Sequence, residues 1–237
     1  MNTKTDVFAY ETLKAFALTQ NYNKWIYEIF KPYIGKNVVE VGCGIGNLTQ
    51  YFLKSCDKLI GIDTSSFFIK HLKIDYPKLE LYNFDITDDK VLSLKDKNID
   101  TIVSVNVLEH VKDDEKALSN MFKLLLPGGY LLLFVPALSW LFGSLDENVK
   151  HYRRYNKGQL KHKIEQAGFK TEKIFYSNFL GIFGWYINCK ILKRRRFPIV
   201  QPIVFDKFVP LLSKIEKNIK PLIGMNLIVI ANKISLL

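Results

Sequence analysis

Short apolar runs recur along this chain, each followed by a segment in which apolar residues repeat at helical spacing. The runs cover residues 38–41, 58–62, 79–83, 99–105, 130–135, 169–177 and 226–232, and their lengths are typical of strands. Helices are expected between them, at residues 46–54, 66–74, 113–125 and 156–166. Strands that alternate with helices predict an α/β domain with a mostly parallel sheet and helices on both faces.

Two further helices are expected before the first strand, at residues 3–18 and from residue 22 onward. In the second, Trp25, Ile26 and Ile29 recur at helical spacing. Farther along, Asn156 with Gln159 three residues later is a capping-box pattern, which predicts the start of the helix at 156–166.

A glycine-rich turn follows the first strand. Because Gly42 and Gly44 have no Cβ, the chain can turn tightly there and bring backbone N–H groups close to a ligand. The spacing is GxGxG, which differs from the GxGxxG of dinucleotide folds and from the GxxxxGK[ST] of phosphate loops. No lysine follows the last glycine, and this argues against ATP or GTP as the ligand.

Polar residues follow the next three strands. Asp63 ends the second strand about twenty residues after the glycines, where nucleoside-binding α/β folds place the acid that binds the ribose hydroxyls. Asp85 follows the third strand and Asn106 the fourth. For Asp85 an ordinary turn residue is the alternative, since Asp is common in turns. The carboxyl ends of parallel strands share one edge, so these side chains should border one crevice.

The runs Glu40-Val-Gly-Cys-Gly-Ile-Gly46, Asp63, Asp85-Ile86, Asn106-Val-Leu-Glu-His110 and Leu126-Pro-Gly-Gly129 appear in this order. Together they resemble the motifs of class I S-adenosylmethionine (SAM) dependent methyltransferases, over residues 22–170. The resemblance implies a Rossmann-like, seven-stranded sheet whose last two strands form an antiparallel pair at its edge. It also implies SAM as the cofactor and a methyl transfer in class EC 2.1.1.

The resemblance assigns roles to the residues at these motifs. It implies that Asp63 binds the ribose diol, that Asp85 and the N–H of Ile86 bind adenine, and that the Asn106 backbone contacts the amino group of SAM. For Tyr22 and Asn23 it implies either contact with the methionine end of SAM or a role in capping and packing their own helix. Further cofactor contacts are expected from Glu40, Gly42, Gly44 and Thr64.

Residues 136–155 follow the fifth strand, so they should emerge at the same edge and form the acceptor pocket. The run His151-Tyr-Arg-Arg-Tyr155 resembles a methyltransferase subgroup often associated with glycosyltransferases and with cell-surface or secondary-metabolite assembly. Substrate contacts are expected from Trp140, Arg153 and Arg154. Either arginine is expected to hold a phosphate or carboxylate of the substrate or to pair with Asp146.

A hydroxyl or ammonium acceptor must lose a proton when it is methylated. His151 is the first candidate for the base, because histidine titrates near neutral pH, and His110 is the second. Glu109 and Tyr152 come next, and a structural tie to Asp146 or Glu147 is the alternative role for His151. No metal site is expected, because the three cysteines are too scattered for one.

Charge is distributed unevenly along the 237 residues, whose net charge is +11. Residues 1–150 hold 17 lysines, no arginine and 19 acids, a net of −2, whereas residues 151–237 hold 17 basic residues and 4 acids, a net of +13. Such asymmetry suggests an anionic partner for the second part, with a solvated basic face as the alternative. Three cysteines and no apolar leader at the N-terminus fit a cytoplasmic setting.

Roughly fifty residues separate the last two strands, too many for a hairpin loop. Residues 174–189 carry no charge, but sixteen residues are fewer than the ~20 that a membrane-spanning helix needs. Aromatic residues beside the basic cluster at 194–196 suit a segment lying on an anionic membrane surface, and packing on the sheet or a homodimer contact are the alternatives. Residues 194–202 are the one stretch that could act as a hinge.

The sequence therefore predicts one SAM-dependent methyltransferase domain: a helical cap at 1–35, a cofactor-binding core at 36–177, a basic and aromatic insertion at 178–225 and a last strand at 226–237. The expected acceptor is an oxygen or nitrogen of a small-molecule or lipid-linked compound, with the protein cytoplasmic or peripheral at the inner membrane face. A membrane- or partner-binding protein without turnover is one alternative. An RNA methyltransferase is another, although residues 106–109 lack the prolines and aromatic expected for base methylation and no nucleic-acid-binding module is evident.

Overall fold

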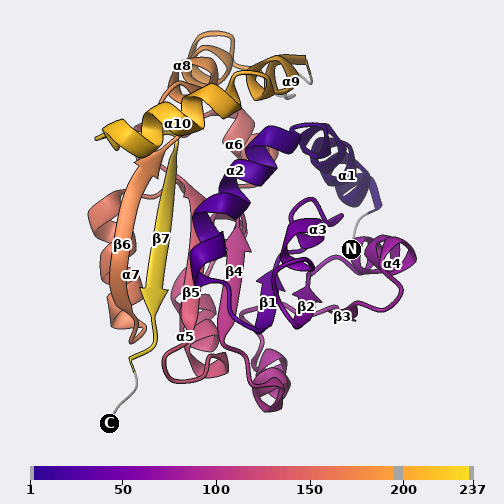
Figure 1. The fold of residues 1–237 in the computed structure, drawn as a ribbon. Helices are drawn as coiled ribbons and strands as arrows, with labels where there is room; N and C mark the ends of the chain where they lie inside the picture. Colours follow the sequence, from indigo (N-terminus) through magenta and orange to yellow (C-terminus); the bar gives the residue numbers. More distant parts are fainter. Residues whose placement is uncertain (1–2, 195–199, 235–237) are drawn as a thin grey trace.

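The computed structural model describes the backbone of residues 3–194 and 200–234, and side chains from residue 9 onward within those ranges. Seven strands form one sheet in the order β3-β2-β1-β4-β5-β7-β6 (Figure 1). Strands β1 to β5 run parallel, and β7 pairs antiparallel with both β5 and β6. The strands are β1 Asn37–Val41, β2 Lys58–Ile62, β3 Glu80–Tyr82, β4 Thr101–Val105, β5 Tyr130–Pro136, β6 Lys170–Ser177 and β7 Asn226–Asn232.

This topology confirms the predicted Rossmann-like sheet with its antiparallel pair at one edge. The described helices are α1 Thr3–Ala17, α2 Gln20–Phe30, α3 Thr49–Phe52, α4 Ser66–Asp75, α5 Asp114–Leu124, α6 Ser144–Asn148, α7 Lys157–Gln166, α8 Gly181–Tyr186, α9 Val200–Asp206 and α10 Val209–Ile219. Short 3₁₀ turns occur at η1 Lys31–Tyr33, η2 Asp89–Lys97, η3 Leu108–His110 and η4 Ser139–Leu141, and a π-helical turn, η5 Ile187–Ile191, continues α8.

Both faces of the sheet are buried, and successive residues of the central strands alternate between two apolar layers. In β5, Leu131 and Leu133 join the layer under α5 and α7, whereas Leu132 and Phe134 join the layer under α2, α3 and α4. Because side chains alternate along a strand, a strand buried on both faces is apolar throughout. The near-continuous apolar runs of the sequence have this cause.

Two local expectations differ from the structure. The helix expected at 46–54 covers only Thr49–Phe52, because Gly46 has φ +87° and its N–H donates to the Cys43 carbonyl in a tight turn. The predicted capping box at Asn156 is wrong: its side-chain oxygen accepts from the N–H and hydroxyl of Ser139 instead. Helix α7 nevertheless starts at the predicted place.

Helices α8, α9 and α10 lie together at one end of the sheet, beside α2 (Figure 1). From here on, "the cap" means residues 178–225 and not the N-terminal helical segment at 1–35. The contact of the cap with α2 is built around Asp206 at the end of α9, whose carboxylate accepts from the backbone N–H groups of Asn21 and Tyr22 at 3.2 and 2.8 Å. The predicted hinge at 194–202 lies partly outside the described residues, and Val200 already belongs to α9. None of the described helices combines the length and apolar character needed to cross a bilayer.

Candidate active site

A cavity of about 1080 Å³ opens at the carboxyl edge of the parallel strands, bordered by α1 and α2 on one side and the cap on another. This edge is where doubly wound sheets bind ligands. Among the predicted cofactor and catalytic residues, its walls include Tyr22, Asn23, Glu40, Gly42, Gly44, Asp63, Thr64, Asp85, Ile86, Asn106, Glu109, His110, His151, Tyr152 and Arg154.

The glycine turn is held to the second strand by Asp63. One Asp63 oxygen accepts from the Gly44 N–H at 2.9 Å and the other from the Ser65 N–H at 2.8 Å. Gly42 has φ +73°, and a Cβ there would lie 2.2 Å from the Val107 side chain. Only glycine fits this position, so the loop lies close against the start of the segment after β4.

Glu40 lies beneath this loop and is buried. Its carboxylate accepts from the Thr49 hydroxyl at 2.6 Å. Burial raises the pKa of Glu40 to about 8, and the Thr49 hydrogen bond opposes that rise only in part. The side chain is therefore neutral at and below neutral pH.

The remaining cofactor candidates are held by local contacts. One Asp85 oxygen accepts from both the N–H and the hydroxyl of Thr87, so this residue also serves the turn that the sequence offered as its alternative role. The Ile86 carbonyl accepts from the Asn120 side chain at 2.9 Å, and Ile86 lines the cavity. Asn106 has φ +53°, and its N–H donates to the Phe134 carbonyl at 2.8 Å.

Tyr22 joins α2 to the last strand. Its hydroxyl donates to the side chain of Asn226 at 3.1 Å and accepts from that of Asn178 at 3.2 Å. Burial raises the pKa of Tyr22. The sequence did not indicate Asn178 or Asn226 as site residues, because both lie more than 150 positions away from Tyr22.

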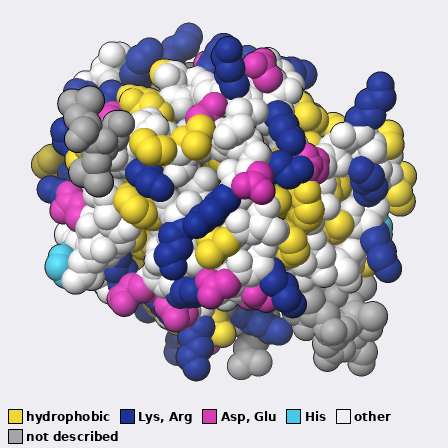
Figure 2. Space-filling view, turned by 90° about the horizontal axis from the view of Figure 1, so that it is seen from below, with side chains coloured by type: hydrophobic (Ala, Val, Ile, Leu, Met, Phe, Trp, Pro, Cys, Tyr) yellow, Lys and Arg dark blue, Asp and Glu magenta, His cyan; other side chains and the backbone are white. Residues whose placement is uncertain are grey.

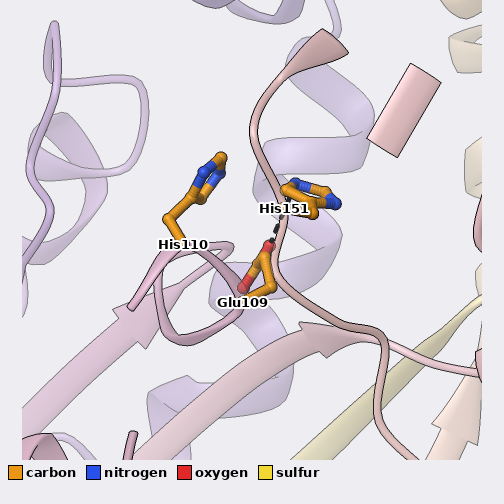
Figure 3. A group of neighbouring side chains, drawn as sticks. All are labelled: Glu109, His110 and His151. Atoms are coloured by element: carbon orange, nitrogen blue, oxygen red, sulfur yellow. Dashed lines mark ion pairs between the residues drawn. The ribbon is translucent and has the colours of Figure 1, made fainter. Parts of the chain in front are cut away.

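On the wall of the same cavity, the side chains of Glu109, His110 and His151 lie close to one another (Figure 3). We call these three residues the acceptor cluster. Nδ1 of His151 lies 2.8 Å from an Asp146 oxygen, and its Nε2 lies 3.8 Å from Oε1 of Glu109. An ionised carboxylate only accepts, so Nδ1 carries the proton and Nε2 faces Glu109.

Asp146 is fully buried and holds His151 in place. It also accepts from Arg154 at 2.8 Å, from the Trp185 indole at 3.2 Å and from the Gly143 N–H at 3.0 Å. Burial acts to raise the Asp146 pKa, but the His151 hydrogen bond and the Arg154 charge outweigh it and lower the pKa below its ordinary value. Asp146 therefore stays ionised and fixes the His151 ring.

Burial shifts the pKa values of the two other cluster members, Glu109 and His110, in opposite directions. It raises the pKa of Glu109 to about 7, against the opposing charge of His151. His110 lines the cavity and part of the residue is exposed. Desolvation of its ring among the neighbouring groups, together with the adjacent His151, lowers the pKa of His110 to about 4.

The run His151–Tyr155 is tied to two buried acids. Arg153 pairs with Asp114 at 2.7 Å, and the Tyr155 hydroxyl donates to the same carboxylate at 2.9 Å. Arg154 pairs with Asp146, and its guanidinium lies 4.4 Å from the centre of the Trp185 ring. Arg154 therefore has the ion pair with Asp146 that the sequence left open. Arg153 also forms an ion pair, but with a different acid, Asp114.

Two predicted substrate residues lie outside the cavity walls. Trp140 is 53% exposed and packs near Tyr186, because η4 turns its side chain toward the cap surface. Arg153 is held against Asp114 on α5 and donates to the Lys112 carbonyl at 2.7 Å. Tyr152 does border the cavity, and its N–H donates to the Glu109 carbonyl at 2.8 Å.

Sequence comparison places this chain among methyltransferases. A methyltransferase domain family matches residues 11–174. A probable SAM-dependent methyltransferase of Mycolicibacterium smegmatis is 29% identical over 151 residues, which cover 63% of this chain and 56% of that protein. The ubiquinone biosynthesis O-methyltransferase of Coxiella burnetii is 30% identical over 119 residues, which cover 50% of this chain and 47% of that protein. The chain thus spans about half the length of these curated relatives.

Structural comparison agrees on the fold. A SAM-dependent methyltransferase of Thermotoga maritima, described as a possible histamine N-methyltransferase, superimposes with a TM-score of 0.66 and 20% identity. The match covers 96% of this chain and 97% of the other.

Proposed function

The chain belongs to the methyltransferase domain family, whose cofactor is SAM, and on this premise we propose that it transfers a methyl group to an oxygen or nitrogen of a hydrophobic or lipid-linked acceptor. The observation that carries the proposal is the position of the acceptor cluster. It borders the same cavity as the glycine turn and Asp63.

The residues near the glycine turn fit SAM. Asp63 holds the loop backbone through both of its oxygens at the carboxyl edge of β2, where the same carboxylate would bind a ribose hydroxyl. Asp85 and Ile86 would bind adenine, and Thr64 and Glu40 would border the sugar. Tyr22 and Asn106 would border the methionine end. When bound, SAM supplies a methyl group made electrophilic by its sulfonium.

The protein's contribution is to position the acceptor and to take up its proton. His151, fixed through Nδ1 by Asp146, presents Nε2 to the cavity and is the first candidate for this role. His110 lies next to it, with ring centres 4.5 Å apart, and Tyr152 is at the rim. Arg154 positions Asp146 through its Nε and also donates to the Ala137 carbonyl.

The surface of the cap supports a hydrophobic acceptor. Fifteen of the 22 large apolar side chains that are exposed among the described residues lie within the cap. On α10, Leu211, Ile215 and Ile219 form an outward stripe, with Lys214 and Lys217 exposed beside it. Apolar side chains flanked by lysines suit the interface of an anionic membrane.

The acids of the cap do not oppose such a contact. It has only two, of which Asp206 is buried against α2 and Glu216 accepts from the N–H groups of Asn178 and Phe179. By contrast, Figure 2 shows acids among lysines on the face at the other end of the molecule. We therefore propose that the cap lies on an anionic membrane and admits the acceptor from it. Arg195 and Arg196, which the sequence included in this surface, lie outside the described residues.

The test follows the methyl group. Protein is incubated with methyl-labelled SAM and a cell extract that contains membranes, and labelled products are counted. His151→Ala should lower the rate of labelling at least 100-fold while SAM affinity by calorimetry stays within twofold of wild type. His162→Ala, at an exposed histidine on α7, is the matched control and should label normally. Full activity of His151→Ala would refute the role of His151.

A further inference from the structure

Glu109 is a buried carboxylate without a hydrogen-bond partner. Its side chain is fully buried, and neither oxygen has a partner among the residues that the structure describes. A buried polar group that lacks a partner costs about 1–3 kcal/mol, and more if it is charged. Such a group calls for a ligand, and Glu109 directs its carboxylate at His151, on the wall of the cavity (Figure 3).

The other two members of the acceptor cluster place possible ligand atoms close to this carboxylate. One ligand atom from each of Glu109, His110 and His151 lies within 4.8 Å of the others. The 3.8 Å between Nε2 of His151 and Oε1 of Glu109 exceeds a hydrogen bond. Two ligands each ~2.1 Å from a tetrahedral ion are separated by about 3.4 Å. A small shift of the His151 or Glu109 side chain would therefore bring these two atoms to the separation that an ion requires.

The surroundings of His151 match those of a metal-bound histidine. Such histidines almost always donate their other N–H to a carboxylate or carbonyl, which fixes the ring and raises its basicity. Asp146 is that carboxylate here, and Arg154, Trp185 and the Gly143 N–H hold it in turn. The free nitrogen of His151 is therefore pre-oriented toward Glu109.

We propose that Glu109, His110 and His151 bind one divalent transition-metal ion, with zinc and manganese as the nearest matches to two imidazoles and one carboxylate. Three protein ligands leave a coordination position open, and here it faces the cavity. This inference rests on the proposed function and states how the cluster would activate an acceptor oxygen: a metal-held hydroxyl would lose its proton more readily, and the proton would pass to water in the cavity. His151 would then act as a metal ligand in place of its role as the base. No spacing motif in the sequence predicts this site, because only the fold brings His151 close to Glu109 and His110.

Metal binding is measured on untagged protein that has been stripped with a chelator and dialysed. Cobalt(II) is titrated by absorption and zinc by calorimetry. Wild type should bind one equivalent and show the visible bands of low-coordinate cobalt. Glu109→Gln and His151→Ala should weaken zinc binding at least 100-fold, and Asp146→Asn 10- to 100-fold. His162→Ala should bind as wild type does.

Two controls separate this inference from the proposed function. SAM affinity should stay within twofold in each variant, which shows that the fold is intact. Methyl transfer should fall at least 10-fold on stripping and return with zinc or manganese. If wild type binds less than 0.2 equivalents of metal, or if Glu109→Gln binds zinc as tightly as wild type, the metal site is refuted. Full transfer by the stripped protein would refute it too, yet leave the proposed function standing.

Discussion

Asp63 holds the glycine turn through its carboxylate, and under the proposed function the same carboxylate binds the ribose of SAM. Its place was predictable from the sequence, since the strand, the glycines and the acid follow one another at fixed short spacing. For Asp146, the sequence offered pairing with His151 and with one of the two arginines as alternatives, and the structure shows both contacts. The sequence did not indicate Trp185, 39 positions later, which only the packed structure brings to Asp146.

Asp63→Asn should weaken SAM binding about 10- to 100-fold, because a hydrogen bond to a charged group contributes about 1.5–3 kcal/mol. Asparagine keeps the size of the side chain and one acceptor oxygen. Calorimetry on the variant, with Asp96→Asn at an exposed site as the control, measures the loss. Unchanged affinity in Asp63→Asn would contradict the ribose assignment.

Glu40 should make stability depend on pH. Its pKa is raised to about 8 in the folded state, above the value near 4.5 of the unfolded chain. The folded state therefore binds the proton more tightly, so this stabilisation is complete below about pH 4.5 and is lost as pH rises to 8.

Between pH 5 and 8, the free energy of unfolding should fall by roughly 2–4 kcal/mol more in wild type than in Glu40→Gln, which cannot titrate. Urea denaturation without SAM measures this difference. Parallel pH profiles for the two proteins would show that the pKa of Glu40 is not raised in the folded state.

At the scale of elements, the strands and most helices were readable from the sequence because their periodicity is local. The contacts of the cap were not. Asp206 binds residues about 185 positions earlier in the chain, and the direction of Trp140 depends on how η4 turns. The helix at 46–54 was shortened for a related reason, since the loop geometry at Gly46 overrides the helical pattern.

Asp206→Ala should loosen the contact of α9 with α2. The variant removes the acceptor of two backbone N–H groups and of the Asn21 amide, so the free energy of unfolding should fall by about 1–3 kcal/mol. Urea denaturation measures the change, and Asp96→Ala at an exposed site controls for loss of charge. A change below about 0.5 kcal/mol would mean that other contacts hold the cap.

On the scale of the whole molecule, charge and exposed apolar surface coincide over the cap, and the cavity opens beneath it. The sequence predicted the charge asymmetry, because composition alone carries it. Which lysines share a face with Leu211 and Ile215 required the structure. The proposed membrane contact rests on that coincidence.

Lys214→Glu with Lys217→Glu should weaken binding to anionic vesicles at least 10-fold, since each lysine near such a surface contributes about 1 kcal/mol. Lys78→Glu with Lys95→Glu changes the net charge equally at exposed sites outside the cap. Co-sedimentation with vesicles that contain phosphatidylserine compares the two double variants. Equal loss in both would indicate a general charge effect and no defined face.

The most direct measurement of the central claim is the fate of the methyl group in wild type. After incubation with methyl-labelled SAM and a membrane-containing extract, the organic and aqueous phases are separated and counted. We predict that the label enters the organic phase and that Asp63→Asn and His151→Ala abolish this transfer. Label confined to small aqueous products would contradict a hydrophobic or lipid-linked acceptor, and wild-type protein that binds SAM yet labels neither phase would contradict the proposed transfer.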